Sequence, residues 1–188
     1  MNTSGRLKII EFKISGLWAF SPRIFSDDRG YFFELWKKDT YKDLGLDVNF
    51  VQDNVSFSKH GVLRGLHFQN PQPQGKLITV LDGEIFDVAV DLRASSPTFG
   101  MWESIIISSQ NRIQFYVPPG FAHGFLVLSN HALVHYKCTD FYCPAAETTL
   151  LWNDPDVAIN WPLNNPILSK KDLEGSRLKD LPKSKLFE

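Results

Sequence analysis

The chain has 188 residues and a formal net charge of −1, and this length suits one domain spanning residues 1–188. So balanced a charge argues against nucleic acid as a partner, because proteins that bind phosphate backbones carry a large basic excess. Two cysteines, Cys138 and Cys143, are too few for a disulfide framework, and no run of about 18 apolar residues predicts a membrane span. We therefore expect a soluble, cytoplasmic protein with no membrane or nucleic-acid partner.

Along the chain, a short helical pattern at residues 36–46 comes first, and strand patterns dominate the middle. β-branched and aromatic runs bounded by turn residues predict strands at 77–81, 84–93, 101–108, 113–117, 124–129 and 132–142. Asp82-Gly83, between the first two runs, predicts a hairpin turn. After Ser169 the letters "SKKD" resemble a capping box ahead of a second short helix. Many short strands at this spacing predict an all-β sandwich or barrel with short peripheral helices.

The strand predicted at residues 84–93 has two different faces. Alternation places Phe86, Val88, Val90 and Leu92 on one face and Asp87, Ala89 and Asp91 on the other. One apolar and one partly polar face suit a strand whose outside is packed and whose inside borders a ligand cavity.

A histidine in the β-rich stretch 61–93 lies between two cations. His67 is three residues after Arg64 and nine before Lys76 in the sequence. Cations near a histidine oppose its protonation, so we expect a neutral imidazole, which serves as a base or as a metal ligand.

A metal site is the less favoured of these two alternatives. "PPGFAHG", which contains His123, resembles the second motif of cupin barrels, P-x-G-x-x-H. The first cupin motif needs H-x-H and a carboxylate, but Phe68 and Gln69 follow His67. Because a transition metal needs three or four protein ligands, we expect no metal, and His123 taken alone suits a structural role at a turn.

A base by itself accelerates proton transfer by roughly 10²–10⁴-fold, so removal of a proton from carbon also needs stabilisation of the resulting oxyanion. Arg64 and Lys76 are suitable donors, each worth about 3–4 kcal/mol, and Tyr136 is suited to return a proton. Each residue taken singly has a commoner structural role, as an interior histidine, a strand-end cation or a core aromatic. Together they indicate deprotonation beside a ketone.

Strict alternation opposes one part of this hypothesis. Arg64 and His67 would lie on opposite faces of one strand. A bulge or bend at Gly65 would bring both side chains to the same side.

Nine segments carry a family resemblance: "DDRGYFFE", "FVQDNVSFSKHGVLRGLHFQ", "QGKL", "GEIFDVAVDLR", "SPTFG", "PPGFAHGF", "YKCTDFY", "WNDPDVAIN" and "LSKKD". In this order, from Ile24 to Asp172, the sequence resembles the dTDP-4-dehydrorhamnose 3,5-epimerase family. The resemblance implies a metal-free, cofactor-free, cupin-like jelly roll that acts as a homodimer on a nucleotide sugar. Its core would span about residues 48–145, with N-terminal strands in the dimer contact and a helical C-terminal tail.

The same resemblance implies roles for individual residues. His67 is similar to the family's catalytic base, Asp172 to the carboxylate that orients it, and Tyr136 to the general acid. Lys76 and Arg64 match residues around the keto and enolate oxygen. Residues matching the nucleotide-binding set are Arg29, Phe32, Glu34, Gln52, Asn54, His123, Tyr142, Glu147 and Lys171.

One departure and three alternatives accompany this interpretation. The family commonly has histidine after "QDN", where this chain has Val55, and we expect that position to tune the pocket or the dimer contact. The motifs do not separate a double epimerase from one acting at C3 alone. A noncatalytic nucleotide-sugar binding protein and a metal-dependent cupin oxygenase are the alternatives from other classes.

Overall fold

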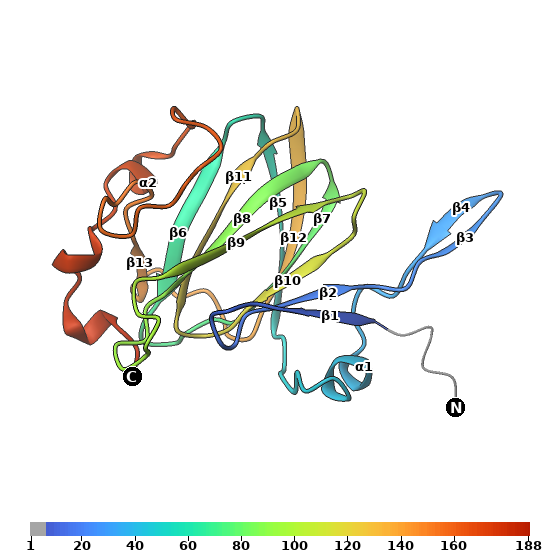
Figure 1. Cartoon of the computed structure of the whole chain (residues 1–188), viewed down its shortest axis with the longest axis horizontal. Coiled ribbons are helices and arrows are strands. Elements are labelled where there is room, and N and C mark those ends of the chain that lie inside the picture. The colour runs from blue at the N-terminus through green and yellow to red at the C-terminus, as the bar shows by residue number, and fades with distance from the viewer. Residues whose placement is uncertain (1–6) are drawn as a thin grey trace.

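The computed structural model describes residues 7–188, which form two large antiparallel sheets that face each other (Figure 1). The six-stranded sheet has the order β1-β2-β10-β7-β12-β5, and the five-stranded sheet has the order β13-β6-β11-β8-β9. The hairpin β3-β4 stands apart from both. The strands are β1 (Lys8–Glu11), β2 (Trp18–Ser21), β3 (Phe25–Asp27), β4 (Gly30–Phe32), β5 (Gln52–Lys59), β6 (Leu63–Gln69), β7 (Lys76–Asp82), β8 (Glu84–Asp91), β9 (Trp102–Ser108), β10 (Gln114–Val117), β11 (Phe121–Val127), β12 (His131–Cys138) and β13 (Glu147–Thr149). The all-β prediction is confirmed.

Helices are short and peripheral, as expected. They are α1 (Lys38–Lys42), α2 (Lys170–Leu173) and the 3₁₀ turns η1 (Leu178–Asp180) and η2 (Lys183–Lys185). The helix predicted at 36–46 is longer than α1, which spans only Lys38–Lys42. After Lys42 the backbone hydrogen bonds join residues three apart, as in turns, and Gly45 adopts a φ of +101°. No helix within residues 7–188 is long and apolar enough to cross a membrane.

Strand boundaries follow the strands' partners more than their own residues. The strand predicted at 132–142 stops at Cys138, because both neighbours end there: Cys138 pairs with Gln52 of β5 and with Lys76 of β7. β11 starts at Phe121, three residues before its predicted start, because it pairs with β8 as far as Asp91. The hairpin predicted at Asp82-Gly83 is wrong, although the turn itself forms and Gly83 has a φ of +86°. β7 pairs with β10 and β12, and β8 pairs with β9 and β11, so this turn carries the chain from one sheet to the other.

The space between the two sheets holds the main apolar core and, adjoining it, a cavity. Core residues from both sheets, such as Ile78 and Phe115 on one and Ile85 and Phe125 on the other, pack together there. The outer face of the five-stranded sheet packs against the C-terminal segment through Val88, Val90 and Leu92. The two faces predicted for β8 are therefore confirmed.

The outer face of the six-stranded sheet is covered only in part. Phe20, Leu77 and Tyr116 pack beneath Tyr41 of α1. On the edge strand β5, Val55 is 60 % exposed and Phe57 is 58 % exposed. Val55, the departure from the family pattern, lies on the face opposite Gln52, Asn54 and Ser56, which border the cavity.

Candidate active site

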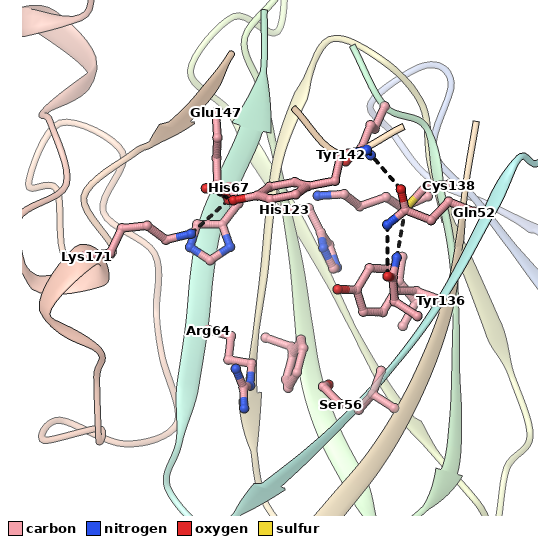
Figure 2. Close-up of a pocket in the computed structure, with 16 residues that line it drawn as sticks. Gln52, Ser56, Arg64, His67, His123, Tyr136, Cys138, Tyr142, Glu147 and Lys171 are labelled. Carbon is pink, nitrogen blue, oxygen red and sulfur yellow. Dashed lines mark hydrogen bonds and ion pairs between the residues drawn. The ribbon is translucent and has the colours of Figure 1, made fainter. Parts of the chain in front are cut away.

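A cavity of about 340 Å³ opens between the two sheets (Figure 2). Strands of the six-stranded sheet supply Lys76 from β7 and Tyr136 from β12, and the five-stranded sheet supplies His67 and His123. The complete lining is Gln52, Asn54, Ser56, Arg64, His67, Gln74, Lys76, Ile78, His123, Phe125, Val134, Tyr136, Cys138, Tyr142, Glu147 and Lys171. Ten of the predicted site residues thus line one cavity.

His67 is held from behind by a carboxylate. Its Nε2 donates a hydrogen bond to Asp172 Oδ1 across 2.5 Å. Asp172 lies in α2, where the Ser169 hydroxyl caps the helix by accepting from the Asp172 backbone N–H at 3.2 Å. The same hydroxyl donates to Asp172 Oδ2 at 2.7 Å. Asp172 therefore takes part in the helix cap and orients His67 at the same time.

The environment of His67 favours the neutral ring. Burial lowers the pKa of His67 below its usual value, and the charges of Lys171 and Lys76 lower it further, while Asp172 opposes them. Burial is the largest cause of the lowered pKa of His67, whereas the sequence analysis expected the flanking cations to keep the ring neutral. With its Nε2 proton donated to Asp172, a neutral His67 keeps an unprotonated Nδ1, which can accept a proton.

Lys76 and Tyr136 are both half-buried, and burial shifts their pKa values in opposite directions, in each case toward the neutral form. Burial lowers the pKa of Lys76, and nearby anionic groups partly restore it. Burial raises the pKa of Tyr136, so the phenol keeps its proton. A half-buried ammonium ion is suited to donate to an oxyanion, and a neutral phenol is suited to be a proton source.

Gly65 brings Arg64 and His67 to the same side of β6. On β11, His123 pairs with His67 and Phe125 with Arg64, so one extra residue of β6 bulges between the two pairs. Gly65 has a φ of +121°, and a Cβ there would lie 2.6 Å from Gly124 Cα. Arg64 Nε donates to Ser58 Oγ at 2.8 Å, which fixes the side chain at the cavity wall.

A polar bridge crosses the mouth of the cavity (Figure 2). Tyr142 donates its hydroxyl to Glu147 at 2.9 Å, and Lys171 Nζ donates to the other Glu147 oxygen at 2.8 Å. The Tyr142 backbone N–H donates to Gln52 Oε1 at 2.9 Å. Burial alone would raise the pKa of Glu147, but bonds from Lys171 and Tyr142 outweigh it and hold the pKa below its usual value. The mouth therefore combines cationic, aromatic and amide groups suited to an anionic ligand.

Residues 11–180 match the sequence model of the dTDP-4-dehydrorhamnose 3,5-epimerase family. This chain belongs to that family. It is 49% identical to the dTDP-4-dehydrorhamnose 3,5-epimerase of Pseudomonas aeruginosa, with 93% of this chain and 97% of the relative covered.

Two solved structures resemble the fold closely. The crystal structure of dTDP-6-deoxy-D-glucose-3,5-epimerase from Legionella pneumophila in complex with dTDP-4-keto-L-rhamnose has a TM-score of 0.94 and 48% identity, covering 97% of this chain and 98% of that one. A 3'-monoepimerase from Streptomyces bikiniensis in complex with dTDP-quinovose has a TM-score of 0.84 and 35% identity, covering 89% and 86%. The cupin-like fold implied by the resemblance is confirmed.

Three residues matching the epimerase family's nucleotide-binding set lie away from the cavity. Arg29 and Phe32 belong to the β3-β4 hairpin, which projects from the sheets (Figure 1). Arg29 pairs with Asp27 at 2.5 Å, and Phe32 is 68 % exposed. Glu34 accepts from the Thr40 hydroxyl at 3.1 Å beside α1. Within one chain, none of the three contributes to the lining of this cavity.

Several site residues were not predicted from the sequence. Asp87 accepts a hydrogen bond from His123 Nε2 at 2.7 Å, and Gln74 and Cys138 belong to the lining. The alternation of β8 had placed Asp87 on the polar inner face, but nothing in the sequence pairs it with a residue 36 positions away. Within residues 7–188, no three His, Cys, Asp or Glu side chains are grouped to hold a metal ion.

Proposed function

We propose that this chain epimerises dTDP-4-keto-6-deoxy-D-glucose at C3 and C5, giving dTDP-4-keto-L-rhamnose. The observation that carries the proposal is His67, a neutral imidazole bonded to Asp172 in a cavity that the Lys76 ammonium group and the Tyr136 phenol also line. The Legionella pneumophila relative, whose structure contains dTDP-4-keto-L-rhamnose, supports this choice of substrate.

In the proposed mechanism, His67 Nδ1 takes the proton from a carbon next to the 4-keto group. The electron pair of that C–H bond moves into the new carbon–carbon double bond of the enolate, and the negative charge develops on the C4 oxygen. Lys76 and Arg64 stabilise that oxygen, each by roughly 3–4 kcal/mol. Tyr136 then gives its proton to the opposite face of the carbon, which inverts the centre.

The second carbon reacts in the same way once the ring has presented it to His67. Between the two steps, His67 and Tyr136 return to their starting protonation states by exchange with solvent. Each carbon ends at the oxidation level at which it began, so the steps consume no oxidant or reductant.

The nucleotide would occupy the mouth of the cavity. Lys171 and the groups around Gln52, Asn54 and Tyr142 are placed to contact the diphosphate and the base, because anionic oxygens accept strong charge-assisted hydrogen bonds. Binding there requires the Tyr142 hydroxyl and Lys171 Nζ, which donate to Glu147, to donate to the ligand as well.

The functional unit we propose is a cytoplasmic homodimer of one-domain chains. The β3-β4 hairpin projects with exposed aromatic residues, and we assign it to the partner's cavity, where Arg29, Phe32 and Glu34 would reach the nucleotide. The exposed Val55 and Phe57 would lie in the dimer contact. Two free cysteines are consistent with a reducing compartment.

Epimerisation at C3 alone is the second candidate, favoured by the likeness to the 3'-monoepimerase. One experiment separates the candidates: the protein is incubated with dTDP-4-keto-6-deoxy-D-glucose in heavy water, and deuterium is located by NMR and mass spectrometry. Label at both C3 and C5 supports the double epimerase. Label at C3 alone identifies the single epimerase, and bound ligand without label contradicts catalysis on this substrate and favours a binding protein.

A further inference from the structure

One hydroxyl in the wall of the cavity has no protein partner. Alternation along β5 places Gln52, Asn54, Ser56 and Ser58 on one face of the strand, toward the other sheet. Gln52 Nε2 donates to Asn54 Oδ1 at 2.9 Å, and Ser58 Oγ accepts from Arg64 Nε at 2.8 Å. In the described part of the chain, no group bonds to the buried hydroxyl of Ser56.

A buried hydroxyl without a hydrogen bond lowers stability, so its presence needs an explanation. Ser56 is half-buried and lines the cavity, which places it against a bound ligand. Rotation about χ1 moves a serine hydroxyl between staggered positions, so the hydroxyl can turn from the wall to the ligand. Ser56 is therefore suited to bond to a group of the ligand.

Strand pairing fixes the place of Ser56 relative to the reacting groups. On β12, Tyr136 pairs with Asn54 of β5, and Val134 pairs with Ser56. Ser56 therefore lies beside Val134, two residues farther along β5 than the residue opposite the phenol. Both Val134 and Ser56 belong to the lining of the cavity.

Ser56 lies at the inner end of the cavity, which Ser56, Val134, Arg64 and Phe125 form. Figure 2 shows Ser56 and Arg64 on the side away from Tyr142 and Glu147, which lie at the mouth. Arg64 of β6 pairs with Phe125 of β11. The inner end thus offers two polar groups, a guanidinium and a hydroxyl, beside apolar side chains.

The proposed substrate has a matching arrangement of groups. Its C1 carries the diphosphate, which the proposed function places at the mouth, and C4 lies across the pyranose ring from C1. C4 and its neighbours C3 and C5 therefore point to the inner end. C4 carries the oxygen assigned to Lys76 and Arg64, C5 carries the C6 methyl group, and C3 carries a hydroxyl. The C3 hydroxyl is the group that still needs a hydrogen-bond partner there.

We propose that Ser56 binds the C3 hydroxyl of the sugar and is a specificity-determining residue of the cavity. This inference rests on the proposed epimerisation and assigns a contact on the sugar ring itself. The Ser56 hydroxyl gains its hydrogen bond only when the sugar is bound. Val134 and Phe125, which are apolar, suit the C6 methyl group.

Two ligands that cannot react test this contact: dTDP-quinovose, which has no 4-keto group, and its 3-deoxy analogue. The wild type should bind the 3-deoxy analogue about 3–10-fold more weakly, because one neutral hydrogen bond is lost. Ser56→Ala should bind both ligands with nearly equal affinity, at the weaker value. Calorimetry measures each Kd, and dTDP alone should bind equally to both proteins.

Ser104→Ala is the matched control, since Ser104 is a half-buried serine of β9 outside the cavity lining. It should distinguish the two ligands as the wild type does. Wild-type protein with equal affinity for the two ligands overturns the proposal. A Ser56→Ala protein that still prefers dTDP-quinovose to the same degree also overturns it.

Stability separates this role of Ser56 from a structural one. Because no protein group bonds to the hydroxyl, Ser56→Ala should leave the free energy of unfolding unchanged or raise it. A lower free energy of unfolding in urea would show that the hydroxyl stabilises the free protein and would overturn the proposal. Wild-type protein that prefers dTDP-quinovose but exchanges no deuterium would contradict the proposed function, while the loss of that preference in Ser56→Ala would still support the contact.

Discussion

At His67, burial and a carboxylate act on the same ring in opposite directions. Burial favours the neutral form and lowers the pKa, while Asp172 favours the imidazolium and raises it. Burial prevails, so the ring stays neutral at neutral pH. In the proposed mechanism, it would stop acting as a base only when the pH falls through its lowered pKa. In the proposed mechanism, Asp172 nonetheless stabilises the imidazolium that forms when His67 takes the proton.

Asp172→Asn should lower kcat by roughly 10²–10⁴-fold. The asparagine amide can donate to Nε2, which would move the ring proton to Nδ1, the atom that must accept. Loss of the carboxylate also removes an effect that raises the pKa of His67, so the acid limb of kcat/KM should shift to lower pH. The pH–rate profile of deuterium exchange measures both changes.

Glu174→Gln is the control for this variant, because it removes an exposed carboxylate at the end of the same helix. Its profile should match that of the wild type. An Asp172→Asn enzyme with an unchanged acid limb and a near-normal rate would show that Asp172 only caps the helix.

Site residues could be predicted from residue types alone only where the cooperating residues lie close together in the sequence. Arg64, His67 and Lys76 lie within one stretch, and their residue types alone indicated a base with oxyanion donors. The Asp172 partner, 105 positions from His67, followed only from the family resemblance. Asp87 was missed because its partner His123 lies on a neighbouring strand, and the local sequence pattern does not predict which strands are neighbours.

At the scale of the element, the β6 bulge decides which side chains enter the cavity. Gly65→Ala should destabilise the protein, because a Cβ would meet Gly124 Cα at 2.6 Å and the His123 carbonyl at 2.7 Å. Backbone strain at this φ costs about 1–2 kcal/mol, and the clash adds roughly 1–3 kcal/mol. Urea unfolding measures the sum, and exchange activity should fall as Arg64 and His67 are displaced.

Gly30→Ala separates strain from clash. Gly30 has a φ of +134° but open space around its Cβ position, so only the backbone strain applies. Equal losses of unfolding free energy in the two variants would contradict a steric reason for glycine at position 65.

Elements with strong local signals were predicted well, and those defined by their partners were not. The bounds of β7 and β8, which have alternation and an Asp-Gly turn between them, were predicted nearly to the residue. Their pairing as a hairpin was wrong, because each strand pairs with other strands in a different sheet. β5, with the polar sequence "QDNVSFSK", had no predicted strand, because its edge position leaves alternate residues exposed and its conformation depends on pairing with β12. β13 is only three residues long and is held by β6.

For the whole molecule, the hairpin proposal predicts complementation between two inactive proteins. Arg29→Ala lacks the contribution of the hairpin, and His67→Asn lacks the base. If the hairpin serves the partner's cavity, mixed dimers contain one cavity with both residues intact, so unfolding and refolding the two proteins together should restore exchange activity.

The control is a mixture of Asp172→Asn with His67→Asn. Both residues belong to the same cavity of one chain, so every cavity in the mixed dimer stays defective and activity should not return. Absence of recovery in the Arg29→Ala mixture as well would show that the hairpin does not act across a dimer.

The role of His67 is tested most directly by His67→Asn in heavy water. Deuterium incorporation at C3 and C5 is measured beside the wild type, and dTDP binding is measured by calorimetry as a check on the cavity. We predict that exchange at both carbons is abolished while dTDP still binds with little change in affinity. Exchange at near wild-type rate in His67→Asn would remove His67 from the role of base and contradict the proposed mechanism.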